Sequence, residues 1–205
     1  MSEMFMKRIF TVGTMAMIIF AAIFASCNCG ASAENVEKAM TPIDNIFERK
    51  SVRSFEDKTV SKDTLELLVK AGMAAPSAMN RQPWQFFVST DKAKMDSLNA
   101  RLPYAKMLKE AAAAVVVLGN PEISKLWMYD CSACTQNVLL AAESLGLGAV
   151  WTAAFPYDDR VNAIKEVYAI PDPWLPLALI PVGYPKGDHQ PKDKWDPAKV
   201  HYEVW

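Results

Sequence analysis

Apolar runs of β-branched residues alternate with amphipathic segments along most of this chain, and the alternation limits the folds open to it. The run at 114–118 reads Ala-Val-Val-Val-Leu, and a second apolar run covers 177–184. Runs of this length and composition are typical of buried strands. The segments between them place apolar residues at helical spacing, as in Leu65, Leu68 and Val69. The sequence therefore predicts a sheet with helices packed on both faces.

Capping and breaking residues set some of the boundaries. Ser61 is a suitable N-cap for a helix over 61–75, and Pro76 ends that helix. The expected helices are 43–50, 61–75, several turns across 92–112, 123–128, 130–145 and 158–168, and the expected strands are 85–90, 114–118, 148–153, 177–184 and a short terminal strand at 200–204.

A segment rich in cations and hydroxyls follows the apolar residues Ile43, Ile46 and Phe47. Arg49, Lys50, Ser51 and Arg53 all lie in it. Arg49 and Arg53 share a face in a helix, and in an extended segment they align with Ser51. Guanidinium groups and a hydroxyl that converge on one spot suit a phosphate dianion. From composition alone, a solvated charged surface is the more common explanation of such a run.

Polar residues also fill the turn between helix 61–75 and the strand expected at 85–90. This turn contains Ser77, Asn80 and Gln82. Carboxamides donate and accept hydrogen bonds, as the edge of a flavin or a nucleobase requires. An ordinary surface turn would explain the same residues, because Asn, Ser and Pro favour turns.

Together the two segments resemble the nitroreductase family of FMN-dependent oxidoreductases. In that family an R-x-S-x-R element holds the FMN phosphate and ribityl chain, and a P-S-x-x-N-x-Q-P-W loop lines the isoalloxazine. Lys50, where arginine is common, and Cys134, where a small apolar residue is usual, depart from the pattern. Similar stretches follow in family order at 130–151, which ends in G-L-G-A-V-W, at 177–185, at 192–194 and at 200–205.

The resemblance covers roughly residues 43 to 205 and implies an α+β, three-layer fold with a central, mostly antiparallel sheet flanked by helices. It implies an obligate homodimer with FMN at the interface, in which both chains build each site. The implied cofactor contacts come from Arg49, Lys50, Ser51, Arg53, Pro76, Ser77, Ala78, Asn80, Gln82, Trp151, Thr152, Ala153, Gly183, Lys192 and Lys194.

The implied reaction is a ping-pong hydride transfer. NADH or NADPH reduces FMN at N5, and a nitroaromatic, quinone or similar small molecule then accepts the hydride. The chemistry belongs to the cofactor, so no catalytic side chain is expected. Arg53 is expected to stabilise negative charge near N1 and O2 of the reduced ring.

Other functions stay open at this point. One is a lipid-anchored flavoprotein that shuttles electrons without a dedicated organic substrate, and another is a dehalogenase-type member of the same family. A third is an exported structural protein without flavin.

The length and net charge of the chain further limit the class of protein and its partners. A chain of 205 residues, half of them hydrophobic, can bury one substantial core. A net charge of −1 argues against nucleic acid as a partner. Two well-separated histidines make a histidine-rich metal site unexpected, so no metal is predicted.

The N-terminus has the pattern of an export signal. Lys7 and Arg8 precede the uncharged run 9–25, as in the n-region and h-region of a signal peptide. Cys27 follows Ala-Ser as in a bacterial lipobox, and Ala31-Ser32-Ala33 offers a cleavage site instead. We therefore expect a signal peptide over 1–33, a tether over 34–42 and the FMN domain over 43–205. The expected protein leaves a bacterial cytoplasm and is a membrane-anchored lipoprotein, or otherwise periplasmic, with the lipid as its only membrane contact.

Cys131 and Cys134 form a Cys-x-x-Cys pair within the helix expected at 130–145. In an oxidising compartment such a pair could act as a redox disulfide. Thioredoxin-like context is missing, and buried cysteine in an apolar helix behaves as a small hydrophobe. Packing is therefore the favoured interpretation.

Overall fold

The computed structural model of the chain describes residues 40–205, which form one compact unit. Its helices are α2 (Pro42–Glu48), α3 (Lys62–Met73), α4 (Lys92–Arg101), α5 (Trp127–Ser144) and α6 (Asp158–Tyr168), with short 3₁₀ turns η1 (Ala78–Asn80), η2 (Lys106–Lys109) and η3 (Pro197–Lys199). Its strands are β1 (Trp84–Ser89), β2 (Ala113–Gly119), β3 (Gly148–Ala149), β4 (Thr152–Ala153) and β5 (Leu175–Gly183).

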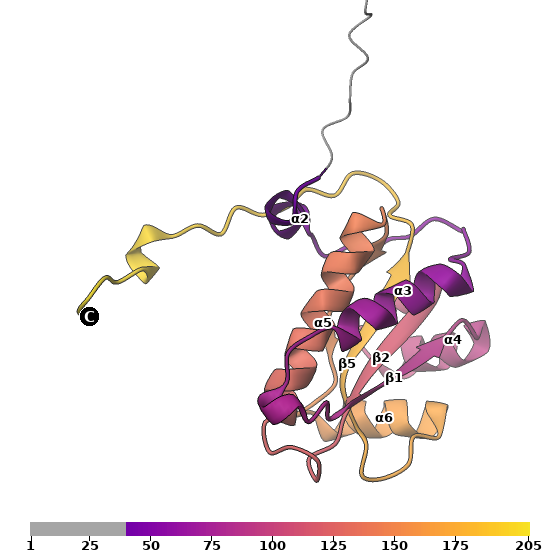
Figure 1. The fold of residues 1–205 in the computed structure, drawn as a ribbon. Coiled ribbons are helices and arrows are strands. Elements are labelled where there is room, and N and C mark those ends of the chain that lie inside the picture. The colour runs from indigo at the N-terminus through magenta and orange to yellow at the C-terminus, as the bar shows by residue number, and fades with distance from the viewer. Residues whose placement is uncertain (1–39) are drawn as a thin grey trace, which may run out of the picture. The chain divides into compact units, whose positions relative to one another are not determined.

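The strands form one sheet in the order β1-β2-β5-β3, and β4 also pairs with β5. Figure 1 shows β1, β2 and β5 side by side. All of these pairings are antiparallel. The predicted α+β class with a mostly antiparallel sheet is thus confirmed.

Helices cover both faces of the sheet, so the fold has three layers (Figure 1). Alternate residues of β2 show this directly, because Val116 packs in the core beneath α4 and α6 while Val115 packs in the core beneath α3 and α5. Every residue of β2 is buried, as the continuous apolar run at 114–118 indicated.

The strand expected over 148–153 is split into β3 and β4. Both halves keep one register on β5, with Ala149 opposite Val182 and Thr152 opposite Leu179. Pro181 lies opposite the gap in this register and has no N–H to donate, so the ladder is interrupted there.

Two further expectations were wrong. Residues 123–128 and 130–145 do not form two helices, because α5 runs without a break from Trp127 to Ser144 and 123–126 is a turn. Residues 200–204 form no strand within the described chain, since this segment finds no sheet edge to pair with and is largely exposed.

The structure describes no helix in residues 40–205 that is both long and apolar enough to cross a membrane. The signal peptide over 1–33 and most of the tether lie outside the described residues. The first helix includes the end of the predicted tether, since Thr41 caps α2 and Pro42 is its first residue.

Candidate functional site

The R-x-S-x-R segment is extended and docks on the edge of the sheet. The backbone N–H of Val52 donates to the carbonyl of Ala149 at 3.1 Å, and Phe55 forms a bridge with Pro185. Val52 and Phe55 are buried, whereas Ser51 and Arg53 are exposed. Of the two geometries that the sequence left open, the structure adopts the extended one, which brings Ser51 and Arg53 to the same exposed side.

Two glycines make room for this docking. A Cβ on Gly148 would lie 2.6 Å from Cγ1 of Val52, and a Cβ on Gly183 would lie 3.0 Å from the ring of Phe55. The predicted site residue Gly183 therefore packs beneath the segment. A larger residue at either glycine would push the segment away from the sheet.

Of the five predicted cofactor-binding cations, one forms an ion pair within the described residues and four do not. Lys50 forms a half-buried ion pair with Glu143 at 2.7 Å, near the C-terminal end of α5. That ion pair engages the Lys50 ammonium within the fold, and its role as a phosphate ligand stays a prediction. Among residues 40–205, the predicted cofactor-binding cations without an ion-pair partner are Arg49, Arg53, Lys192 and Lys194.

The loop after α3 has an unusual backbone. Met79, Asn80 and Gln82 have positive φ angles of 52°, 53° and 47°. Each such residue costs on the order of 1–3 kcal/mol and persists only where the surroundings enforce it, most often at ligand sites. Ser77 stabilises the turn by accepting the N–H of Gln82 on its hydroxyl at 3.0 Å. The Gln82 amide donates to Oδ1 of Asn80 at 3.0 Å, so the two predicted carboxamides lie together.

Pro76 and Ala78 complete this loop, and Ala78 leads to a residue that sequence reasoning missed. The backbone N–H of Ala78 donates to Oδ1 of Asp130 at 2.9 Å. Asp130 is buried in the first turn of α5. A carboxyl group in an otherwise apolar helical stretch was the available signal, because buried acidic residues need polar partners.

The remaining predicted residues are Trp151, which immediately precedes β4, and the two residues of β4 itself. Trp151 is half-buried in the core beneath α3 and α5. The hydroxyl of Thr152 donates to the carbonyl of Leu179 at 2.5 Å. Ala153 is exposed, and its carbonyl accepts Nη1 of Arg160 at 3.1 Å. Ala153 is thus accessible at the edge of the sheet.

A single chain does not bring the two predicted halves together. The R-x-S-x-R segment lies near Glu143 at the C-terminal end of α5, and the carboxamide loop is bonded to Asp130 at its N-terminal end. Thirteen residues of helix separate these anchor points, which corresponds to about 20 Å along the axis. Figure 1 shows η1 and α2 at opposite ends of α5.

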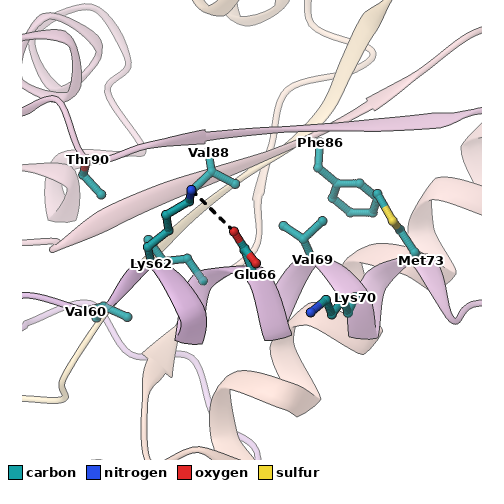
Figure 2. Close-up of a pocket in the computed structure, with 10 residues that line it drawn as sticks. Val60, Lys62, Glu66, Val69, Lys70, Met73, Phe86, Val88 and Thr90 are labelled. Atoms are coloured by element: carbon teal, nitrogen blue, oxygen red, sulfur yellow. Dashed lines mark ion pairs between the residues drawn. The ribbon is translucent and has the colours of Figure 1, made fainter.

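A groove of about 710 Å³ lies elsewhere, between α3 and β1. Figure 2 shows Val69, Met73, Phe86 and Val88 along it, and the Lys62–Glu66 ion pair at 3.7 Å. None of its lining residues is a predicted cofactor contact. The predicted site therefore does not coincide with this groove.

Cys131 and Cys134 are free thiols buried against the sheet. Sγ of Cys131 lies 3.6 Å from the carbonyl oxygen of Leu118. Burial raises the pKa of both thiols, that of Cys134 to about 12. Thiols in this environment are unreactive at neutral pH, which supports the packing interpretation.

Comparisons with known proteins agree with this arrangement. The model of the nitroreductase family matches residues 46–117 and 92–184, which together exceed half of the chain. A protein from Methanothermobacter thermautotrophicus, provisionally named NADH dehydrogenase/NAD(P)H nitroreductase, is 37% identical over 169 residues, which cover 81% of this chain and 88% of the relative.

Solved structures are similar as well. A Bacteroides thetaiotaomicron protein with the same provisional name is 52% identical, with a TM-score of 0.79 over 80% of this chain and 98% of that one. A provisionally named nitroreductase from Desulfovibrio desulfuricans, solved in complex with FMN, is 27% identical, with a TM-score of 0.69 over 80% of this chain and 97% of that one. The extended basic segment, the carboxamide loop, the three-layer fold and these matches lead to one conclusion: this chain belongs to the nitroreductase family.

Proposed function

We propose that this protein is a homodimeric, FMN-dependent NAD(P)H oxidoreductase that reduces a small organic acceptor such as a nitroaromatic or a quinone. One observation carries the proposal: within residues 40–205, one extended segment presents cations without an ion-pair partner and one strained loop presents clustered carboxamides. These two chemistries fit the two ends of FMN, its phosphate and the polar edge of its ring. Relatives named FMN reductase and NADPH-flavin oxidoreductase support the assignment.

The residues present fit FMN at the phosphate end. Arg49 and Arg53 have no ion-pair partner in the part of the chain that the structure describes, and Ser51 is exposed between them. Guanidinium groups that are not neutralised by a neighbouring carboxylate can bind a phosphate with two parallel hydrogen bonds. Lys192 and Lys194 would add positive charge from the tail.

The residues also fit at the ring end. When bound, FMN would supply the hydride chemistry that links NAD(P)H to the acceptor. Asn80 and Gln82 would bind ring or ribityl oxygens with their carboxamides. Ala153 would present its backbone N–H to the opposite ring edge. Arg53 would stabilise negative charge near N1 and O2, where a fixed cation favours the reduced state.

A second copy of the chain would complete each site. The two halves lie about 20 Å apart along α5 within one chain, as estimated from the helical rise. Exposed apolar side chains support an interface, since Phe47 on α2 is 72% exposed and Trp205 in the tail is 98% exposed. Surfaces of this kind are typical of contacts between protein chains. In the proposed dimer, one chain provides the basic segment and its partner provides the carboxamide loop.

Ligand binding to the chain without its first 33 residues tests the cofactor. FMN should bind far more tightly than riboflavin, because each lost charge-assisted bond to phosphate is worth roughly 1.5–3 kcal/mol. The bound protein should then oxidise NADH or NADPH when a quinone or nitroaromatic is added. Equal affinity for FMN and riboflavin would overturn the phosphate assignment, and oxidation that no organic acceptor accelerates would favour the electron shuttle.

We also propose that the protein is exported and anchored by a lipid on Cys27. Support comes from the uncharged run 9–25 and the Ala-Ser-Cys sequence that follows it. A lipid anchor contributes about 0.8 kcal/mol per buried CH₂. Cys27→Ala should therefore release the protein from the membrane fraction into the soluble exported fraction. A wild-type protein that is already soluble outside the cytoplasm would point to cleavage after Ala33.

A further inference from the structure

Asp130 stands out by its burial. It is the only buried Asp, Glu, Lys, Arg or His among residues 40–205, and it forms no ion pair with them. A buried carboxyl group is costly unless hydrogen bonds satisfy its oxygens. The N-terminal turn of α5 also favours an acidic group there. The hydrogen-bond partners of the Asp130 carboxylate should therefore explain why this residue is buried.

Its two oxygens bind two separate segments. Oδ1 accepts the N–H of Ala78 at 2.9 Å, and Oδ2 accepts the hydroxyl of Ser124 at 3.3 Å. The Ser124 oxygen in turn accepts the N–H of Leu126 at 3.1 Å, which leaves its own proton for Asp130. Ser124 is itself buried. Asp130 is thus held in place by the turn before α5, with one oxygen aimed at the carboxamide loop.

That oxygen meets the loop where its backbone becomes strained. Ala78 immediately precedes Met79 and Asn80, two of the residues with positive φ. On the C-terminal side, Arg81 donates to the carbonyl of Ile123 at 3.1 Å. On the N-terminal side of the turn, the Ala78–Asp130 bond joins the loop to α5. Without it, one flank of the strained turn would lose its anchor.

We infer that Asp130 is a positioning residue for the cofactor: through the N–H of Ala78 it fixes the loop at 76–82, so that the Asn80 and Gln82 carboxamides are ordered before any ligand arrives. A loop ordered in advance does not lose conformational entropy on binding, which increases affinity. This inference rests on the proposed function for what the loop binds. The claim that Asp130 fixes the loop stands independently of it.

Trypsin cleavage of the cofactor-free protein tests the loop directly, because Arg81 is exposed and lies inside it. Asp130→Ala should speed the appearance of the fragment that ends at Arg81 by about tenfold or more, as expected for a loop that opens locally. Asp63→Ala is the matched control, since it makes the same change in the first turn of α3 at an exposed position. Trypsin should cleave the Asp63→Ala protein at Arg81 as slowly as it cleaves wild type.

Conservative variants and FMN binding separate positioning from general stability. Asp130→Asn keeps an oxygen for Ala78 and should restore slow cleavage, whereas Ser124→Ala leaves the Ala78 bond intact and should have a smaller effect than Asp130→Ala. The dissociation constant for FMN should rise about tenfold or more in Asp130→Ala, as expected for a binding loop that is no longer preorganised. Suppose that Asp130→Ala is cleaved faster than wild type but neither protein binds FMN. The positioning role of Asp130 would then be upheld, and the proposed cofactor would be wrong.

If Asp130→Ala does not fold, amide hydrogen exchange in the wild-type protein tests the inference instead. The Ala78 amide should exchange at least about tenfold more slowly than a free amide, as a lasting bond to Asp130 requires. The Met79 amide, which has no hydrogen-bond acceptor in the described chain, is the internal reference. Equal exchange at the two amides would overturn the inference. So would an Asp130→Ala protein that melts earlier yet keeps wild-type loop cleavage and FMN affinity.

Discussion

Arg49 and Arg53 lie in one short segment and have no ion-pair partner among residues 40–205, yet we expect their loss to have different effects. Arg49→Ala should mainly weaken FMN binding, because it would remove a proposed phosphate ligand. Arg53→Ala at saturating FMN should slow flavin reduction by about 100-fold or more and lower the reduction potential, because it would remove the proposed stabilisation of negative charge that develops during hydride transfer. Stopped-flow reduction by NADH and a redox titration measure both effects. A normal rate and potential in Arg53→Ala would place Arg53 among the phosphate ligands.

The buried thiols give a prediction about pH. Burial raises the pKa of Cys131 and Cys134 above the ordinary value of 9.0. Above pH 9 the unfolded chain therefore loses thiol protons that the folded protein keeps, so stability falls as the pH rises. Between pH 8 and pH 10, wild type should lose roughly 1–3 kcal/mol more unfolding free energy than a Cys131→Ala, Cys134→Ala double variant.

Urea unfolding at both pH values measures this difference, with turnover as the control. At neutral pH the double variant should be about 1–2 kcal/mol less stable than wild type, because two buried sulfur atoms are lost. Its turnover should stay within a few-fold of wild type. A large loss of turnover with FMN still bound would instead mean that the thiols take part in electron flow.

At the scale of elements, the contact between Gly148 of β3 and Val52 determines where the basic segment lies. Gly148→Ala would place its Cβ 2.6 Å from Cγ1 of Val52, so one of the two must shift. We expect a loss of about 1–3 kcal/mol from overpacking, together with weaker FMN binding. Adding Val52→Ala should relieve the clash and recover much of the affinity. Fluorescence titration with FMN checks this, and unchanged affinity in Gly148→Ala would mean that the segment tolerates displacement.

The elements show which parts of a fold a sequence can predict. Strand β2 was predictable because its residues are apolar on both faces and no proline interrupts it. The split between β3 and β4 was not, because its cause is Pro181 in the neighbouring strand, and strand pairing is not visible along the chain. The start of α5 was missed because Trp127 and Tyr129 fit either of two helices until Asp130 is seen to bind the preceding turn.

The candidate site shows the same limit. The sequence singled out Ser51, Arg53, Asn80 and Gln82 because their side chains have the chemistry that a cofactor needs, and their contact with FMN stays a prediction. Asp130 was not singled out, because its bond to the loop is made with the backbone N–H of Ala78, a contact between residues 52 positions apart. Sequence patterns indicate which groups can bind a ligand, whereas the groups that hold them in place appear only once the chain has folded.

On the scale of the whole molecule, the placement of the two proposed half-sites at opposite ends of α5 has a genetic consequence, intersubunit complementation. In the proposed dimer, a chain with Arg49→Ala and a chain with Asn80→Ala each form homodimers in which every site has one defect. A mixed dimer of the two concentrates both defects in one site and leaves the other intact. Random pairing of equal amounts should therefore restore about a quarter of wild-type sites, as expected for a twofold-symmetric dimer. Coexpression followed by an NAD(P)H oxidation assay measures the recovery; if each site belonged to a single chain, two defective proteins would produce no active one.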